Sequence, residues 1–520
     1  MNVRIPIALG FLALIGSVCA AQLPEGLAYL KPGTPEVGGV RDLCLIYHGM
    51  KSRVAWTKEA LMPYVAYVDE QGRPRDWLFD SFLFIEFATD SGAWLHAYRQ
   101  DHPQATAEDW VWLADCWFRQ DTGLIGLEQA VAEVGATLGD PDRKVNVVIT
   151  MPKAMEQIRQ FGPLAGRQEV LDFSRAEDQH QAMAWYIERV LGHWQQHNYQ
   201  HLNLVGCYWL AESIAEADHE LVRWAAEYLH ARGQKLYWIP YFGASGLHKW
   251  QERGIDATML QPNYFFQKEP ELERLPKAAR RAGTAGCGIE IEFDARALIS
   301  EDYRQRFYAY LDAGVKYGWM NEALLGYYEG GRAVKIFAET PGLGRELYEA
   351  VYRFVKGSYQ MSGKVDLSGM EIPAHDNTGN LALATKGARI HGCVRHEDQP
   401  ELAPEKIIDG DIYNYGGMYG YGYFAWPNSF TIELPQSASV ARTHTMLHDS
   451  VGQSFRYRIE TSTDNQNWEP AVDKSEGEWR GWQVDEFAPR EAKYIRFTGL
   501  HNTANANFQV VEFEAYAAQQ

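Results

Sequence analysis

Short apolar runs alternate with longer amphipathic stretches from roughly residue 40 to residue 360. The stretches Gln181–Trp194, Ser213–His230 and Asp302–Ala313 space their apolar residues as one face of a helix does. The apolar runs have the length of buried strands: Asp42–Tyr47, Ser81–Phe87, Lys144–Met151, Asn203–Trp209, Lys235–Tyr241, Ala257–Gln261, Gly286–Phe293 and Val315–Asn321. Eight buried strands, each followed by a helix, predict a closed (β/α)8 barrel of the TIM type. A doubly wound open sheet is the alternative, but no G-x-G-x-x-G motif follows the first run.

The pattern changes near residue 360. Residues 359–380 are rich in Gly, Ser, Asp and Asn, which is typical of a linker. Beyond them lie short strand-like runs separated by turn residues: Ser429–Leu434, Ser454–Ser462, Tyr494–Gly499 and Phe508–Tyr516. These runs predict an all-β sandwich. We therefore expect an α/β barrel domain over residues 21–360, a linker over 361–374 and a β-sandwich over 375–520.

The N-terminus has the layout of a signal peptide, which we assign to residues 1–20. A basic residue, Arg4, precedes an apolar run from Ile5 to Val18 that is too short to span a membrane. This pattern predicts an exported protein, either periplasmic or secreted to the medium or cell surface. A lipid-accepting Cys19 is the alternative, although Val18 is larger than the residue that lipoprotein processing prefers. No later run is long enough to cross a membrane, so no further membrane association is expected.

Composition narrows the class of partner. With 49 Lys and Arg against 68 Asp and Glu, the formal net charge is −19, which disfavours nucleic acid and anionic membrane surfaces. Aromatic residues make up 13% of the chain, so either the cores are very aromatic or an aromatic surface meets a flat partner such as a sugar. No G-x-S-x-G, H-E-x-x-H or Walker motif occurs, which disfavours serine hydrolases, zinc proteases and nucleotide-dependent enzymes. We expect no catalytic cofactor, and the sequence predicts no particular oligomeric state.

Four phrases of the C-terminal part resemble the discoidin-like (coagulation factor 5/8 type C) fold: Ile408–Asp411, Arg458–Trp468, Ala492–Phe497 and Val511–Tyr516. That fold is common as a carbohydrate-binding module, so the resemblance implies a carbohydrate partner. It also implies a structural calcium ion, held by the acidic residues Asp409 and Asp411 and by Glu512 on the last strand. Hard oxygen ligands suit calcium. The alternative is a turn-forming Asp-Gly pair without a metal.

Residues 413–430 alternate tyrosine with glycine. Such a segment cannot form a packed helix, and its glycines let another backbone or a ligand approach closely. We expect either a sugar-stacking surface or a loop that lies on the barrel and joins the two domains.

The barrel part resembles, through Trp77–Ser81, Gln261–Tyr264 and Gly288–Asp294, a bacterial domain family of unknown function that is often joined to such modules. That family implies no activity. The layout is also similar to that of retaining glycoside hydrolases, which carry the acid/base at the end of the fourth strand and the nucleophile at the end of the seventh. Glycoside cleavage uses two carboxyls, and Glu212 and Glu292 occupy these places. The resemblance therefore implies Glu212 as general acid/base and Glu292 as nucleophile.

The seventh predicted strand has one acidic face. Glu290, Glu292 and Asp294 alternate with apolar residues, so we expect the three carboxyls to point into the barrel. Burying carboxyls costs free energy unless they have partners or a function. Glu290 lies deeper and is a candidate orienting group, whereas Asp294 is the alternative nucleophile. The structural alternatives are a solvated acidic rim or a salt bridge for this strand, and a helix N-terminus for Glu212.

Further substrate-binding candidates lie near the predicted strand ends: Tyr47, His48, Asp80, Trp209, Tyr241, Gln261, Asn263, Tyr264, Glu290, Asp294, Trp319 and Asn321. Many hydrolases of this layout have Asn before the acid of the fourth strand, but this chain has Ala211. Gln261 and Asn263 are therefore candidates for contacting the sugar 2-hydroxyl. Trp319, on the predicted eighth strand, is either a platform for the reacting sugar ring or a core residue.

These observations favour an exported, retaining glycoside hydrolase that acts on an oligosaccharide, a polysaccharide or a glycoconjugate. A retaining enzyme would hold its two carboxyls about 5–5.5 Å apart. Two alternatives remain open at this point. The chain is either a non-catalytic glycan-binding protein or an inverting hydrolase or lyase that uses the same cleft.

Overall fold

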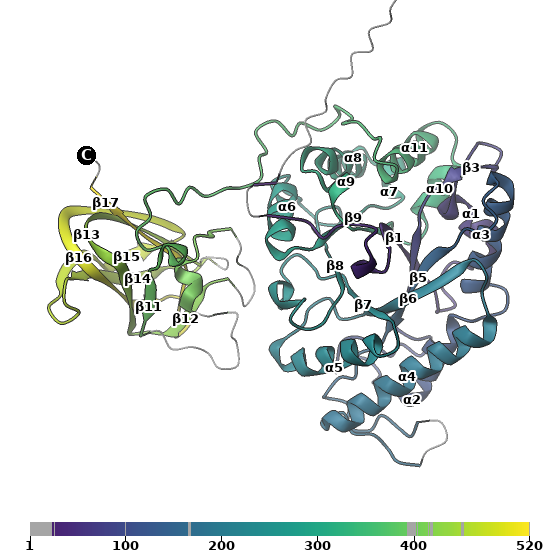
Figure 1. Ribbon diagram of the computed structural model, residues 1–520, viewed down its shortest axis with the longest axis horizontal. Helices are drawn as coiled ribbons and strands as arrows, with labels where there is room; N and C mark the ends of the chain where they lie inside the picture. The colour runs from purple at the N-terminus through teal and green to yellow at the C-terminus, as the bar shows by residue number, and fades with distance from the viewer. Residues whose placement is uncertain are drawn as a thin grey trace, which may run out of the picture.

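The computed structural model describes residues 23–24, 27–98, 100–164, 168–392, 402, 404–413, 415, 420–448 and 452–518. The predicted signal peptide, with Cys19, lies outside these residues, as does part of the Gly/Tyr segment 413–430. A barrel ringed by helices forms the first part of the chain, and a β-rich domain forms the second and contains the C-terminus (Figure 1). Within the described residues, no helix is both long and apolar enough to cross a membrane.

Eight parallel strands close the barrel, as the sequence predicts: β1 (Asp42–Tyr47), β4 (Ser81–Ile85), β5 (Val145–Met151), β6 (Leu202–Trp209), β7 (Lys235–Trp238), β8 (Ala257–Leu260), β9 (Gly288–Glu292) and β10 (Leu325–Tyr328). Neighbours in the barrel follow the order of the chain, and β10 pairs with β1 to close the ring. Most strand residues are buried on both faces, which explains why the runs are continuously apolar. A short antiparallel ribbon, β2 (Ala66–Val68) with β3 (Pro74–Trp77), lies outside the barrel.

The predicted eighth strand, Val315–Asn321, is wrong. That segment contains the end of helix α8 (Glu301–Lys316) and the short helix α9 (Trp319–Glu322), and the strand that closes the barrel is β10. Gly318, with φ 83°, separates the two helices in a left-handed conformation. A short apolar run is compatible with either a buried helix or a buried strand, and periodicity alone does not separate them.

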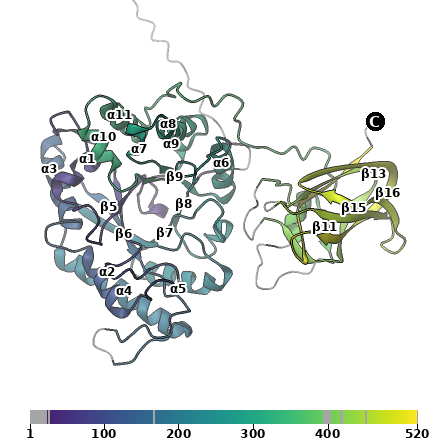
Figure 2. The same cartoon turned by 180° about the vertical axis from the view of Figure 1, so that it is seen from behind.

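Helices surround the barrel in both views (Figures 1 and 2). Besides α8 and α9, they are α1 (Lys58–Val65), α2 (Ala107–Cys116), α3 (Leu124–Leu138), α4 (Ala176–His197), α5 (His219–His230), α6 (Arg274–Ala285), α7 (Arg296–Ile299), α10 (Ala333–Glu339) and α11 (Leu343–Val355). Much of the aromatic content lies in the core between them and the strands. The indole rings that are less than 2% exposed are those of Trp56, Trp110, Trp117, Trp209, Trp238 and Trp319.

The second domain is an antiparallel β-sandwich, also as predicted. Its strands are β11 (Arg389–His391), β12 (Gly422–Ala425), β13 (Asn428–Leu447), β14 (Phe455–Ser462), β15 (Glu469–Trp479), β16 (Trp482–Asn502) and β17 (Asn507–Ala517). The hydrogen-bonded order is β12-β17-β13-β16-β14-β15, with β11 on the edge of β13. The long strands β13 and β16 pair over most of their length, with register shifts where they bend. Phe430, Phe497 and Phe513 pack together in its own core.

The segment between α11 and β11 is attached to the barrel rather than free. Asp312 of α8 is fully buried and accepts hydrogen bonds from Tyr359 Oη at 2.8 Å and from Ser362 N and Oγ at 2.7 Å. Farther along, Lys316 Nζ donates to the carbonyl of Leu367 at 2.7 Å. These bonds fix the path of the chain over α8 before it enters the sandwich.

Two arginines of α6 contact the sandwich side. Arg280 donates to the carbonyl of Pro373 at 2.8 Å and forms an ion pair with Asp411 at 3.1 Å. Arg281 donates to the carbonyl of Tyr415 at 3.4 Å. The described tyrosines at the start of the Gly/Tyr segment therefore lie against the barrel, which is one of the two expectations for that segment.

Candidate active site

A cavity of about 300 Å³ opens where the barrel strands end at their carboxyl side. It is lined by Leu45, Tyr47, Ile85, Phe87, Tyr208, Glu212, Ile239, Gln261, Asn263, Phe266, Glu290, Glu292 and Tyr328. Glu292 is the last residue of β9, and Glu212 follows β6 by three residues. Counted around the barrel, β6 is the fourth strand and β9 the seventh. This is the end of a (β/α)8 barrel at which enzymes of this fold place their chemistry.

Three donors hold the carboxyl of Glu292. Tyr310 Oη, on α8, donates a hydrogen bond to Glu292 Oε2. The backbone N–H of Tyr264 donates to the same oxygen at 3.2 Å, and Asn263 Nδ2 donates to Oε1 at 3.5 Å. Hydrogen bonds of this kind stabilise the ionised form of a carboxyl.

Two amides connect Glu292 to Glu212. Asn263 Nδ2 also donates to Gln261 Oε1 at 3.0 Å, and Gln261 Nε2 donates to Glu212 Oε1 at 3.2 Å. Asn263 has φ 50°, a left-handed conformation that is uncommon for a residue other than glycine. Its Oδ1 accepts the backbone N–H of Phe242 at 2.7 Å, which fixes the orientation of the amide. The turn after β8 thus holds both carboxyls through one pair of side chains.

Burial raises the pKa of all three cavity carboxyls. For Glu292, burial raises the pKa to about 7, against the opposing effect of its donors. For Glu290, burial and then the charges of Glu292 and Glu212 raise the pKa well above its usual range. Burial also raises the pKa of Glu212, while Gln261 lowers it. Of these two carboxyls, Glu290 holds a proton more firmly, because Glu292 has the hydrogen-bond donors.

Aromatic rings form much of the cavity wall. Tyr47 and Tyr328 lie with ring centroids 5.6 Å apart, and Phe266 lies 5.2 Å from Tyr328. Of the wall residues, Tyr208, Phe266 and Tyr328 were not among the sequence candidates, and neither was Tyr310. The sequence does carry a signal for Tyr328, because a short apolar run precedes Glu329-Gly330-Gly331. No local signal marks Tyr310, which comes to Glu292 from the following helix.

Several predicted substrate residues lie outside the cavity. His48 is buried behind the strands, where its Nε2 donates to the carbonyl of Cys116 at 3.0 Å, and burial lowers its pKa to about 4. Asp294 pairs with Arg296 at 2.8 Å. Trp209 is buried at the end of β6, and Tyr264 contributes its backbone N–H. Tyr241 is 40% exposed, and its N–H donates to the carbonyl of Glu212 at 3.3 Å.

The expectation that Asp80, Trp319 and Asn321 lie at the mouth is wrong. Asp80 directly precedes β4, and it lines a separate cavity of about 260 Å³ at the amino ends of the strands, together with Asp42 and Asn321. Trp319 is fully buried in α9. Asp80 lies at the amino end of its strand and not at the carboxyl end, where the mouth is. Trp319 and Asn321 were expected at the mouth because Val315–Asn321 was predicted to be the eighth strand.

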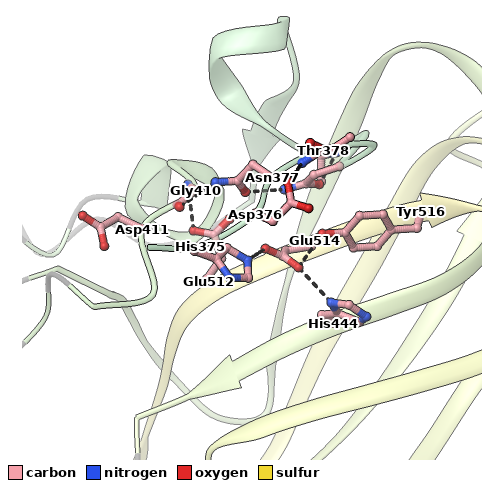
Figure 3. A network of polar contacts seen from close by, with 12 residues as sticks. His375, Asp376, Asn377, Thr378, Gly410, Asp411, His444, Glu512, Glu514 and Tyr516 are labelled. Atoms are coloured by element: carbon pink, nitrogen blue, oxygen red, sulfur yellow. Dashed lines mark hydrogen bonds and ion pairs between the residues drawn. The ribbon is translucent and has the colours of Figure 1, made fainter. Parts of the chain in front are cut away.

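Two of the three predicted calcium ligands, Asp411 and Glu512, are labelled beside Gly410 in Figure 3, and the third, Asp409, directly precedes Gly410. Glu512 Oε2 accepts the backbone N–H of Gly410 at 3.0 Å, while its Oε1 is buried without a hydrogen-bond partner among the described residues. Asp409 Oδ1 accepts the N–H of Asp411 at 3.0 Å. The carboxylate of Asp411 instead forms an ion pair with Arg280 of the barrel. In the part of the chain that the structure describes, no group of three or more His, Cys, Asp or Glu side chains is arranged to hold a metal. Glu512 Oε1 fits a hard cation, whereas Asp409 Oδ2 pairs with Lys406 at 3.2 Å and Asp411 pairs with Arg280.

A second polar network lies beside these residues on β17. Glu514 is fully buried and accepts hydrogen bonds from His444 Nδ1 at 2.9 Å, from Tyr516 Oη at 2.8 Å and from His375 Nε2 (Figure 3). His375 belongs to the segment that arrives from the barrel. The network therefore fastens this segment to the strands of the sandwich.

Comparison with known proteins gives matches to both domains. The F5/8 type C domain matches residues 394–513. BTB/POZ domain-containing protein 9 of Homo sapiens is 32% identical over 150 residues, which are 28% of this chain and 22% of that protein. The protein of the same name from Rattus norvegicus is 28% identical over 137 residues, 26% of this chain and 22% of its own. The chain thus matches about a fifth of the length of these curated relatives.

Among solved structures, the CBM32 of AlyQ in complex with 4,5-unsaturated mannuronic acid has a TM-score of 0.22 at 17% identity, covering 25% of this chain and 95% of its own. The chitosan-binding module 1 from a Paenibacillus sp. IK-5 chitosanase/glucanase has a TM-score of 0.22 at 23% identity, covering 26% and 98%. The family model described as a domain of unknown function, DUF4855, matches residues 42–353. Since this match covers more than half of the chain, the protein belongs to the DUF4855 family and carries an F5/8 type C domain after its barrel.

Proposed function

We propose that the barrel is a glycoside hydrolase in which Glu212 is the general acid/base and Glu292 the nucleophile. The observation that carries this proposal is the amide bridge through Gln261 and Asn263, which holds the two carboxyls at one cavity. Hydrolysis of a glycoside uses two such carboxyls, one as proton donor and one as nucleophile or base. The aromatic wall adds a surface on which the C–H face of a sugar can pack.

The protonation states suit this division of roles. The raised pKa of Glu212 keeps a proton available for the leaving oxygen. Glu292 is ionised when Glu290 holds a proton, because Tyr310, Tyr264 N–H and Asn263 stabilise its charge. Without a cation beside it, Glu290 is then a neutral neighbour of the nucleophile.

The reaction would proceed in two displacements. A Glu292 oxygen bonds to the anomeric carbon as the glycosidic bond breaks, and Glu212 transfers its proton to the departing oxygen. In the second step, Glu212 takes a proton from water, whose oxygen bonds to the anomeric carbon and releases Glu292. The product keeps the anomeric configuration of the substrate.

Parallel assays of Glu292→Gln, Glu212→Gln and Asp294→Asn on a panel of aryl glycosides and glycans test this proposal. We expect the first two variants to lose at least about a thousandfold in kcat, and Asp294→Asn to retain activity because Asp294 pairs with Arg296 outside the cavity. When the substrate carries an activated leaving group, azide should restore turnover to a variant that lacks the Glu292 carboxylate. Unchanged hydrolysis by Glu292→Gln would refute the assignment, and an inverted or unsaturated product would replace it with inversion or elimination.

We further propose that the protein is exported and that its F5/8 type C domain binds carbohydrate and so brings the barrel to a polymeric or conjugated glycan. The family match over residues 394–513 supports this role for the second domain. The test compares the full-length protein with a chain that ends at Ala374, which keeps the segment that packs on α8. We expect the shorter chain to lose activity on insoluble glycans and to keep it on soluble ones. Equal activity of both chains on both kinds of glycan would contradict the proposed targeting role.

A further inference from the structure

The cavity between Glu212 and Glu292 is acidic, and the described residues that line it include no Lys, Arg or His. Two arginines contact aromatic rings of the cavity wall, and both already have carboxylate partners. Arg53 lies 4.9 Å from the ring centroid of Tyr47 and pairs with Glu86 at 2.6 Å. Arg296, which pairs with Asp294, lies 5.3 Å from the ring of Phe266. A ligand that carries a carboxylate or sulfate would therefore meet like charge in this cavity.

Glu290 is the cavity carboxyl that neither attacks the sugar nor protonates the leaving oxygen in the proposed reaction. It is 2% exposed, and it accepts no hydrogen bond from any residue that the structure describes, unlike Glu212 and Glu292. The ionised form of a buried carboxyl without a donor is costly. A positively charged group on a ligand would pair with the carboxylate of Glu290 in place of its proton.

Three tyrosines line the cavity together with Glu290. Burial first, and then the charges of Glu290 and its neighbours, raises the pKa of Tyr47, Tyr208 and Tyr328. The faces of such rings attract cations, and their hydroxyls stay protonated at neutral pH. Carboxyl and rings together form a surface that favours a compact ammonium group over an anion.

The size of the cavity limits what enters. Its volume of about 300 Å³ equals about ten water molecules, which suits one monosaccharide unit rather than several. One sugar ring can then lie between the two catalytic carboxyls while a single substituent reaches Glu290.

We propose that the cavity selects an amino-substituted sugar unit, a hexosamine with a free amine, whose ammonium group pairs with Glu290 against Tyr47, Tyr208 and Tyr328. The inference rests on the proposed function because it requires a sugar to bind in the cavity. It does not require that the sugar is cleaved. N-acetylated, neutral and uronic acid units are bound less well, because they carry no positive charge for Glu290.

Calorimetric titration of the full-length protein at about pH 6, where an amine of ordinary pKa is protonated, tests this selection. The probes are a glucosamine oligosaccharide, its N-acetylated counterpart and a matched oligosaccharide with uronic acid units. We expect the free amine to bind about tenfold or more tightly than the acetylated form, as for one hydrogen bond to a charged group. In Glu290→Gln this preference should disappear, whereas Glu301→Gln, an exposed carboxyl of α8, should retain it.

A second measurement uses only the wild type, so its result does not depend on whether Glu290→Gln folds. In the wild type, the amine preference should fall as the pH rises through the titration of the ligand amine, at about pH 8. Equal or tighter binding of the acetylated or uronic acid probe, or an amine preference that survives in folded Glu290→Gln, would overturn the inference. An amine preference without cleavage would refute only the hydrolase, and cleavage of neutral glycans without this preference would refute only the selection.

Discussion

Tyr310 donates a hydrogen bond to Glu292 from helix α8, which follows the strand that ends in Glu292. The same hydroxyl accepts the N–H of Tyr264 at 3.3 Å, so it lies between the turn after β8 and the carboxyl at the end of β9. Tyr310 is fully buried, and its position is fixed by the packing of α8 against the barrel. The ionised form of Glu292 is therefore stabilised by a residue from a different element.

Replacing Tyr310 with Phe removes one donor to the ionised form of Glu292. The pKa of Glu292 should rise, so the acidic limb of the kcat/KM profile should move to higher pH. At the original optimum, kcat/KM should fall about ten- to a hundredfold, as for one lost hydrogen bond to a charged group. Tyr308→Phe is the matched control, because the Tyr308 hydroxyl accepts from Lys364 at 2.9 Å outside the cavity. An unshifted profile for Tyr310→Phe would contradict the role given to it.

Two variants of Asn263 separate its amide from its backbone. Both Asn263→Gly and Asn263→Ala break the bridge between Glu292 and Glu212, so both should lower kcat with little change in the measured binding of substrate. Only Asn263→Ala places an unfavourable side chain at φ 50°, and it should be about 1 kcal/mol less stable than Asn263→Gly. Urea unfolding of the two proteins measures this difference. Equal stabilities would mean that the backbone relaxes out of the left-handed conformation.

Calcium should stabilise the sandwich through Glu512. Its Oε1 is buried without a partner among the described residues, and burial followed by the charge of Asp409 raises its pKa, so a cation would relieve both costs. We expect millimolar calcium to raise the Tm of the wild type by several degrees, as for a ligand that binds only the folded state. Glu512→Gln should lose this response, while Asp411→Asn should keep it because Asp411 pairs with Arg280. A calcium response that persists in Glu512→Gln would place the ion elsewhere.

The ion pair between Arg280 and Asp411 should hold the sandwich against α6. Arg280→Ala removes this pair and the bond to the carbonyl of Pro373, so the segment 361–374 should become more accessible. Limited proteolysis should then cleave this segment faster than in the wild type, with little change in the activity of the barrel on small substrates. Arg304→Ala, which removes a pair with the exposed Glu301 on α8, is the comparison variant. Equal cleavage rates in all three proteins would show that the pair does not hold the domains together.

The positions of Glu212 and Glu292 could be predicted because they depend on strand order. Once eight apolar strands are assigned to a barrel, the ends of the fourth and seventh strands meet at one mouth, whatever the loops do. The error at Val315–Asn321 left this result intact, since it fell after the seventh strand. It removed Tyr328 from the candidates and added Trp319 and Asn321 in its place.

The sequence by itself determined the two domains, the barrel, the sandwich and the carboxyls at the mouth, because each depends on local periodicity and on the order of elements. Tertiary structure alone decided which groups surround those carboxyls. Tyr310 reaches Glu292 from α8, and Arg280 takes Asp411 away from Glu512. Hydrogen bonds and burial depend on side chains that are distant along the chain, and they set the charge of each carboxyl. That is why the sequence located the acidic groups but not their protonation.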